Sequence, residues 1–550
     1  MSTQMIQATF LIIGIVGLSY MGVLAQRRVK SHEDMSVAGR TLGAWSIFFS
    51  LSAFWGGNTI ASIVELAHKD GIASAWFGLA RFAMFILIIL VTGGAFRKLG
   101  MISLSDFVFQ RTDSRLLRLL LGMIIGINFA IFMVSSVVGA AAFFTAIMGW
   151  PVWVSVIFTV VSFLVYTSLG GMHAVSYNGK ILTVGQLMAL LVVTVVALNM
   201  AGWDNVMHLE PRYFEVLPDN YIGTIVVWFF TFVTNAFVAQ GALQIVMSSR
   251  TINEGKKGLL YVALGFVPII ALAPLAGMAA KVLFPDIRSI EAMPTLASRI
   301  PSAILSTIVV MGLYFTTLGW ASSCLLSGGT VVANDIYRYF VPDASPEKLV
   351  RVSRIAIAIL SVLTVGFAIL LPSGVEFWTI VGFVLRNTAL FPLILTGLFW
   401  NAISKKAAIC AAIAGSCTGI VWYLIKFPFF LFDAHPMFVG MAVSEVVIVL
   451  GTVIEYRGQM RFTPAPIGIF FGLLGCGGLV ITILFAREIL RMKLIAACIS
   501  FTVSFFFLAV IFILRRTKGE GSPPELPPGK NHDGPDAKSP IPQRLPCGGV

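Results

Sequence analysis

Two arginines lie within stretches that are otherwise apolar enough to cross a membrane. Arg81 belongs to the apolar run 73–96 and Arg386 to the run 376–399. A charged side chain at the centre of a bilayer costs roughly 2.5–3.5 kcal/mol on insertion scales, so each is a candidate functional residue. A guanidinium presents a fork of donors that suits a carboxylate or sulfonate. Arg386 is therefore expected to act as an anion clamp, or as a fixed positive charge where a cation would bind. For Arg81 the alternative is an ion pair with Glu65.

A second polar feature interrupts the apolar stretch 50–68. It carries Gly56-Gly57-Asn58 in its middle and Glu65 near one end. Irregular backbone at bilayer depth is tolerated only where it lines a cavity or is buried in protein. We therefore expect a discontinuous helix at a substrate site, with Phe54 and Trp55 as candidate cavity walls. Glu65 and Arg81 are expected to act as a gate, or Glu65, if its pKa is raised, to carry a proton.

The composition defines the class of protein that must position these residues. Of 550 residues, 58% are hydrophobic and 11% are charged, whereas a soluble protein has about a quarter charged. The net charge of +13 does not indicate nucleic-acid binding, because the basic residues cluster in short loops between apolar runs. No metal-ligand cluster, nucleophile constellation or phosphate-binding loop is recognisable, so we expect no enzyme, no cofactor and no metal. The sequence predicts an all-α polytopic protein in the cytoplasmic membrane.

Apolar runs of about 20 residues recur along the chain. About 15 spans are predicted: 6–25, 44–66, 73–96, 119–147, 150–170, 180–200, 223–247, 257–284, 301–333, 350–371, 376–399, 406–425, 437–455, 466–486 and 494–514. Loops rich in Lys and Arg follow the first, third, seventh, ninth and eleventh spans. This pattern predicts an N-terminus outside and a C-terminus inside the cell. Arg487, Arg491 and Lys493 depart from it. Residues 517–550, rich in Pro, Gly and charge, are expected to form a disordered cytoplasmic tail.

An ordered set of motifs across residues 30–420 resembles the sodium:solute symporter family. These motifs lie at 37–43, 50–68, 104–111, 166–175, 240–257, 321–337 and 397–400. The resemblance implies a LeuT-type fold of two inverted five-helix repeats, with additional helices at both ends. The expected parts are a helix and loop at 1–43, a first repeat at 44–200, an extracellular loop at 201–222, a second repeat at 223–400, peripheral helices at 401–516, and the tail.

The resemblance also implies where substrate and ion bind. Substrate would lie at mid-membrane between the first helices of the two repeats, the second of them broken near Thr234 and Asn235. In this family a sodium ion is held by carbonyls of the first broken helix and by two hydroxyls on the ninth span. The candidate ligands here are Ser52, Ala53, Gly56, Gly319, Trp320, Ser322 and Ser323.

Two departures from the family pattern bear on sodium. The positions expected to supply the two hydroxyls are Gly319 and Trp320, and neither side chain has a hydroxyl. The family's Thr-Asp after the Gly-Gly loop is replaced by Asn178-Gly179, followed by Lys180. The bulk of the Trp320 indole is expected to fill the cation position. Ser322 and Ser323 would supply oxygens if the register differs by a turn.

The leading functional hypothesis is a secondary active transporter working by alternating access. Its substrate would be a small polar solute, anionic or zwitterionic, coupled to sodium or to protons, or moved by exchange. The alternative is a membrane sensor or scaffold that has kept the fold and lost transport. The lipid bilayer is an expected partner, and the sequence does not predict an oligomeric state.

Overall fold

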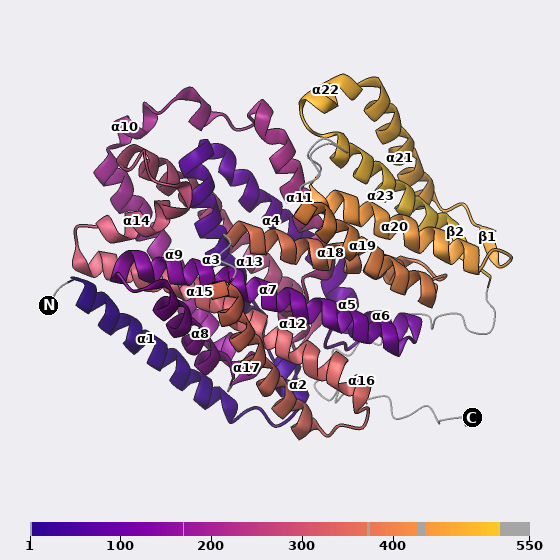
Figure 1. The fold of residues 1–550 in the computed structure, drawn as a ribbon, viewed down its shortest axis with the longest axis horizontal. Coiled ribbons are helices and arrows are strands. Elements are labelled where there is room, and N and C mark those ends of the chain that lie inside the picture. Colours follow the sequence, from indigo (N-terminus) through magenta and orange to yellow (C-terminus); the bar gives the residue numbers. More distant parts are fainter. Residues whose placement is uncertain (1–2, 169, 371–374, 426–434, 518–550) are drawn as a thin grey trace.

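A computed structural model of the protein describes residues 3–517 apart from 169, 371–374 and 426–434 (Figure 1). The predicted tail lies outside the described residues except for Thr517. The described chain is almost entirely helical. Its first half contains α1 (Thr3–Gln26), α2 (His32–Val37), η1 (Ala38–Arg40), α3 (Ala44–Asp70), η2 (Gly71–Ser74), α4 (Ala75–Leu87), η3 (Ile88–Thr92), α5 (Gly93–Lys98), α6 (Leu104–Thr112), α7 (Arg115–Met148), α8 (Val152–Ser168), α9 (Gly171–Ala201), α10 (Trp203–Met207), η4 (Pro211–Phe214) and η5 (Asp219–Tyr221).

The second half continues in the same way and ends in a short β-ribbon. It contains α11 (Ile222–Val238), α12 (Gln240–Met247), α13 (Ile252–Leu283), η6 (Ser289–Glu291), α14 (Ala292–Arg299), α15 (Ala303–Val331), η7 (Val332–Tyr337), α16 (Arg338–Phe340), α17 (Pro346–Leu370), α18 (Val375–Phe399), α19 (Lys405–Ile425), α20 (Pro436–Glu455), β1 (Met460–Phe462), α21 (Pro466–Leu484), α22 (Ala486–Arg491), α23 (Ile495–Ile513) and β2 (Leu514–Arg516). The two strands pair antiparallel.

The helices agree with the predicted membrane spans. Within the described residues, 12 helices are long and apolar enough to cross a membrane, or up to 13 if the bent pair α11–α12 is one span. This count takes residues 44–98 as one stretch, although η2 separates α3 from α4 within it, and it omits the shorter apolar helix α8. Once α3 and α4 are counted separately and α8 is included, every predicted span coincides with a helix. This agreement confirms an all-α, polytopic membrane protein.

The interruption predicted at Gly56-Gly57-Asn58 is wrong, because α3 is a continuous helix from Ala44 to Asp70. The two glycines permit close packing. A Cβ on Gly57 would lie 1.9 Å from Cβ of Thr316 and 2.5 Å from its Cα, and a Cβ on Gly56 would lie 2.4 Å from Nε2 of Gln186. Small residues therefore let α3 approach α15 and α9 closely, as is common between helices in membranes.

The second predicted interruption is present, a few residues beyond its predicted place. Helices α11 and α12 are bent by 44° at Ala239, rather than near Thr234 and Asn235. Hydrogen bonds from other helices stabilise the bend: Thr92 Oγ1 donates to the Ala236 carbonyl at 2.9 Å, and the Leu104 amide donates to Oε1 of Gln240 at 2.7 Å. Residues before and after α5 thus form hydrogen bonds with the two halves of the broken span.

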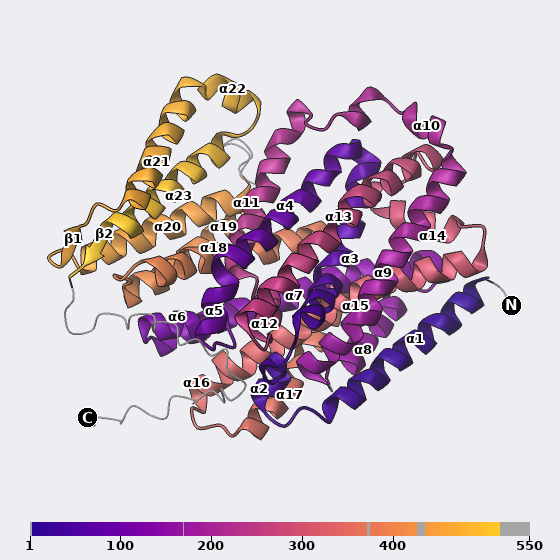
Figure 2. The same ribbon diagram turned by 180° about the vertical axis from the view of Figure 1, so that it is seen from behind.

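The tertiary arrangement places the basic loops at one end of the molecule. Helices α10 and α14 lie at one end in both views, whereas α2, α6, α16 and the β1–β2 ribbon lie at the other, which we call the basic end (Figures 1 and 2). There Arg97 donates to the Ser249 and Arg250 carbonyls, and Arg40 to the Gly100 and Met101 carbonyls. Helix α3 packs on α9, α13 and α15 in the core, and α21 and α23 pair at the edge, where α23 also packs on α20.

Candidate functional site

Gly319 and Trp320 close the position at which the family resemblance implies a cation. The Trp320 ring stacks on Phe54 with ring centroids 4.8 Å apart and meets Trp55 edge-on at 5.3 Å. A Cβ on Gly319 would lie 2.2 Å from the Ala53 carbonyl oxygen, so this oxygen is in contact with the α15 backbone. A hard cation requires a shell of oxygen ligands. Indole and backbone carbon occupy this space, so the residues between α3 and α15 do not fit a sodium ion there.

The other candidate ion ligands have separate environments. Ser322 Oγ donates to the Gly319 carbonyl at 3.2 Å, and the Ser52 carbonyl accepts from Nε2 of Gln186 at 2.8 Å. The hydroxyls of Ser52 and Ser323 are buried without a hydrogen-bond partner among the described residues. A role for these two hydroxyls in ion binding stays a prediction.

The second departure from the family pattern also serves packing. Asn178 is fully buried, and its Nδ2 donates to the Leu18 carbonyl of α1 at 3.1 Å. A Cβ on Gly179 would lie 3.0 Å from the Phe49 carbonyl oxygen of α3. Lys180 is exposed. Where the family has a carboxylate, this chain therefore has an uncharged contact that joins α9 to α1 and α3.

Arg386 lies on α18 in an environment of neutral amides. Its side chain is 3% exposed. The guanidinium donates to Oδ1 of Asn235, to Oδ1 of Asn387 at 3.2 Å through Nε, and to Oδ1 of Asn128 at 3.4 Å through Nη1. None of the ion pairs in the described part of the chain includes Arg386. Its hydrogen bonds are satisfied in part, but its charge is not neutralised by a carboxylate.

Arg81 on α4 is a second buried cation of the same kind. Its Nη1 donates to the Trp55 carbonyl at 3.1 Å and to the Thr59 hydroxyl, while Nε has no partner among the described residues. The Trp55 and Phe232 rings each lie 4.6 Å from the guanidinium carbon. The predicted alternative of an ion pair with Glu65 is wrong, because no ion pair among the described residues includes Arg81.

Aromatic rings connect the two arginines with the closed cation position. Phe132 on α7 contacts Trp320 at 5.5 Å and Phe383 at 5.1 Å, and its ring lies 5.3 Å from the guanidinium carbon of Arg386. Phe383 in turn lies 6.5 Å from Phe232, a ring beside the other guanidinium. A guanidinium over a ring face is stabilised by the ring quadrupole, which partly compensates its burial.

These contacts define a central cluster that includes most of the predicted substrate-binding residues. Asn387 Nδ2 donates to Thr234 Oγ1 at 3.1 Å, and this hydrogen bond adds Thr234 to the cluster. Gly56 and Gly57 instead contact α9 and α15, and Asn58 Oδ1 accepts from the Ser62 hydroxyl on its own helix. The central cluster consists of Phe54, Trp55, Arg81, Asn128, Phe132, Phe232, Thr234, Asn235, Trp320, Phe383, Arg386 and Asn387.

Sequence reasoning overlooked three contributors on α7 and α18. Asn128, Phe132 and Phe383 contact Arg386 or its neighbours, yet none was predicted. For Asn128 a signal was present, because an amide in the apolar run 119–147 is conspicuous for the same reason as a buried arginine. For the phenylalanines there was none, since packing is the usual role of such rings in a span.

The end of α3 away from the basic end is held by His68. Its Nε2 lies 3.1 Å from the Phe284 carbonyl and its Nδ1 lies 3.3 Å from the Ser289 hydroxyl, so the ring joins α3 to the segment after α13. Glu65 lies half-buried one turn earlier. The gating role expected for Glu65 stays a prediction.

A buried polar network at the basic end joins the two halves of the chain. Arg118 on α7 pairs with Asp106 at 2.5 Å and with Asp335 of η7 at 3.0 Å. The Ser103 hydroxyl donates to the same Asp335 oxygen at 3.0 Å, and Asn334 Nδ2 donates to Asp106 at 2.8 Å. The network therefore joins α6 and α7 to η7 at this end.

His32 of α2 borders this network and makes stability depend on pH. Burial, and secondarily the charge of Arg338, lower the pKa of His32 from 6.5 to about 4. The unfolded chain binds a proton in this window and the folded chain does not, so stability is complete above pH 6.5 and declines towards pH 4. We expect a loss of at most about 3 kcal/mol. In detergent, the melting temperature of the parent should fall more than that of His32→Gln between pH 7.5 and pH 5. Parallel pH profiles of the two proteins would contradict this prediction.

Comparison with known proteins identifies the class. The structure superposes on a Na+-coupled sialic acid symporter in a substrate-bound outward-open state with a TM-score of 0.70, at 18% identity, over 82% of this chain and 97% of that one. The fold is accordingly that of a LeuT-type transporter. Helices α3–α9 and α11–α18 coincide with the two predicted repeats, with α1 before them and α19–α23 after them, and the division into repeats stays a prediction.

The family model for the sodium:solute symporter family matches residues 36–415, and the chain belongs to this family. The sodium/proline symporter of Escherichia coli (strain K12) is 24% identical over 487 residues, which cover 82% of this chain and 94% of that protein. The sodium/glucose cotransporter of Vibrio parahaemolyticus is 24% identical over 432 residues, covering 70% and 78%.

Proposed function

We propose that the protein is a secondary transporter that moves a small organic anion across the membrane by alternating access. The observation that carries this proposal is Arg386, a buried guanidinium whose partners Asn128, Asn235 and Asn387 are all neutral. A carboxylate entering the central cluster would supply the missing negative charge. The guanidinium already has the bidentate geometry that such a group requires.

The surroundings of Arg386 also favour a solute with an apolar part. Phe132 and Phe383 lie 5.3 and 5.6 Å from its guanidinium carbon, and Trp320 packs beyond them. A binding site formed by these residues would bind apolar groups through its rings and orient the solute through a few polar groups. A zwitterion would place its ammonium group near these ring faces, which attract cations.

The expected movement follows from the contacts of the central cluster. Arg386 on α18 donates to Asn128 on α7 and to Asn235 on α11, and its hydrogen bond to Asn128 joins the second repeat to the first. Close to Asn235, the bend at Ala239 divides the first span of the second repeat into α11 and α12. An anion that replaces the two asparagines as partners of Arg386 would uncouple α18 from α7 and α11 and favour the alternative packing of the repeats.

For coupling, the geometry favours protons over sodium bound between α3 and α15. Ala53 touches Gly319, and Trp320 fills the adjacent space. Symport of an organic anion with a proton needs no metal-ion shell. The topology we propose has the basic end in the cytoplasm, in accordance with its arginines and lysines.

Uptake by proteoliposomes tests the function and its coupling. We expect uptake of some small carboxylates, but not of the corresponding amides, to be accelerated by an inward proton gradient and unaffected when sodium is replaced by choline. Uptake that requires sodium would refute the proposed coupling. Carboxylates that raise the melting temperature without entering the vesicles would refute transport and favour the sensor alternative.

A further inference from the structure

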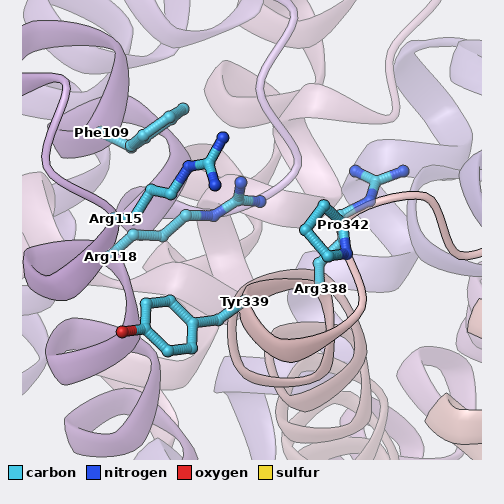
Figure 3. A pocket seen from close by; sticks show the side chains of 6 residues that line it. All are labelled: Phe109, Arg115, Arg118, Arg338, Tyr339 and Pro342. Atoms are coloured by element: carbon cyan, nitrogen blue, oxygen red, sulfur yellow. The ribbon is translucent and has the colours of Figure 1, made fainter. Parts of the chain in front are cut away.

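A small pocket opens at the basic end, away from the central cluster. It lies between the start of α7 and the short helix α16, and Figure 3 shows the guanidinium groups of Arg115 and Arg118 side by side within it. Its volume is about 150 Å³. The lining residues are Phe109, Arg115, Arg118, Arg338, Tyr339 and Pro342. Nothing in the proposed transport mechanism uses this pocket.

The pocket carries a positive charge that the described chain does not neutralise. Two carboxylates at this end, Asp106 and Asp335, pair with Arg118. Arg338 donates to the neutral Asn334 side chain at 3.2 Å. Arg115 is exposed, and its side chain takes part in neither a hydrogen bond nor an ion pair among the described residues. Two guanidinium groups therefore remain available to an anion.

The backbone adds to this charge. Helix α7 is 34 residues long and begins at Arg115, and its first turn contains no acidic residue. A helix N-terminus is the positive end of the helix dipole and favours anions, so the basic residues Arg115 and Arg118 are electrostatically unfavourable there. An anion bound between the N-terminus of α7 and these side chains would attract both the positive end of the dipole and the guanidinium groups. It would therefore offset the repulsion between them.

The position of the pocket relative to the membrane indicates the source of the anion. The apolar stretch of α7 begins at Arg115, so the pocket lies where this span leaves the hydrocarbon. Leu116 is 54% exposed and Phe340 is 69% exposed beside it, and Tyr339 also reaches the surface. Aromatic and basic residues are enriched at headgroup depth, and exposed apolar side chains at that level contact acyl chains.

We propose that this pocket binds the phosphate of an anionic phospholipid headgroup. The phosphate would lie between Arg115 and Arg338, and the acyl chains would run along Leu116 and Phe340. A pocket of this size accommodates a phosphate but not a typical metabolite, whose sites are about 300–1,000 Å³. Basic pockets between transmembrane helices on the cytoplasmic side bind lipid headgroups in this manner. Because Arg115 belongs to the first repeat and Arg338 to the second, the bound lipid would bridge the two.

Thermal unfolding in a neutral detergent tests the proposal without any transported solute. We expect short-chain phosphatidylglycerol to raise the melting temperature by about 3 °C or more. Phosphatidylcholine of the same chain length and inorganic phosphate at the same concentration should leave it unchanged. In Arg115→Gln and in Arg338→Gln the shift should fall by at least half. An equal shift with inorganic phosphate would overturn the lipid assignment in favour of a free-phosphate site.

Lys257→Gln is the matched control, because Lys257 is exposed and lies at the start of α13, whose N-terminal residues contact the basic end. It removes the same charge outside the pocket and should retain the full shift. An equal loss in Lys257→Gln and Arg115→Gln would overturn the proposal, since it would show unspecific attraction. Native mass spectrometry gives a second measurement that does not depend on stability: phosphatidylglycerol should be retained by the parent and Lys257→Gln, and lost from Arg115→Gln. Equal retention by all three proteins would also overturn the proposal.

Discussion

Arg386→Gln is expected to abolish binding and uptake of the organic anion. Leaving a buried charge without its partner costs about 2–5 kcal/mol, which corresponds to an affinity about 30- to 5,000-fold lower. Gln can still donate to Asn235, but it supplies no charge to a carboxylate. The measurement is the affinity of a carboxylate that stabilises the parent, followed by its initial rate of uptake.

Two companion variants separate the charge from the fold. Arg386→Lys keeps the positive charge and loses the planar fork, so its affinity should lie between those of the parent and Arg386→Gln. Lys180→Gln removes an exposed charge of α9 and should bind as the parent does. Full affinity in Arg386→Gln, with a melting temperature close to that of the parent, would refute the anion clamp.

Gly319→Ala is expected to destabilise the protein by about 1–3 kcal/mol, because the added methyl group has no space. Its Cβ would lie 2.2 Å from the Ala53 carbonyl oxygen and 2.7 Å from the Ala53 carbonyl carbon. Both belong to the backbone of α3, so relief requires α3 and α15 to move apart. That movement would also disturb the stacking of Trp320 on Phe54. Unfolding in mixed micelles measures the loss.

Gly366→Ala on α17 is the matched control for this prediction. No atom lies within 4 Å of the Cβ that it would gain, so the change adds a methyl group to a helix without a clash. Ala is favoured over Gly in a helix interior, so we expect this variant to be as stable as the parent or up to about 1 kcal/mol more stable. Equal stability of Gly319→Ala and Gly366→Ala would contradict the close contact of α3 with α15.

The same contact bears on attempts to restore sodium dependence. Gly319→Ser would introduce the hydroxyl that the family resemblance implies at this position, but its Cβ meets the same Ala53 carbonyl. A cation site therefore requires α3 and α15 to separate, and one hydroxyl does not achieve this.

The sequence by itself determined the class, the spans and the identity of the two buried arginines. Long apolar runs have only one stable arrangement in a bilayer, because every backbone group must be hydrogen-bonded within a helix, and this made the spans predictable. Arg81 and Arg386 could be recognised for the same reason, since a charge in such a run is costly. The ordered motifs correctly predicted the family and hence the fold.

The tertiary structure alone decided what the glycines and the arginines contact. Gly56-Gly57 predicted a broken helix, but α3 is continuous there, because a glycine pair permits close helix packing as readily as a break, and only the neighbours Thr316 and Gln186 distinguish the two. Glu65 is close to Arg81 in sequence, yet Arg81 donates to Trp55 and Thr59. The partners of Arg386 come from residues 128 and 235, more than 150 positions away, and sequence spacing contains no information about contacts between helices so far apart.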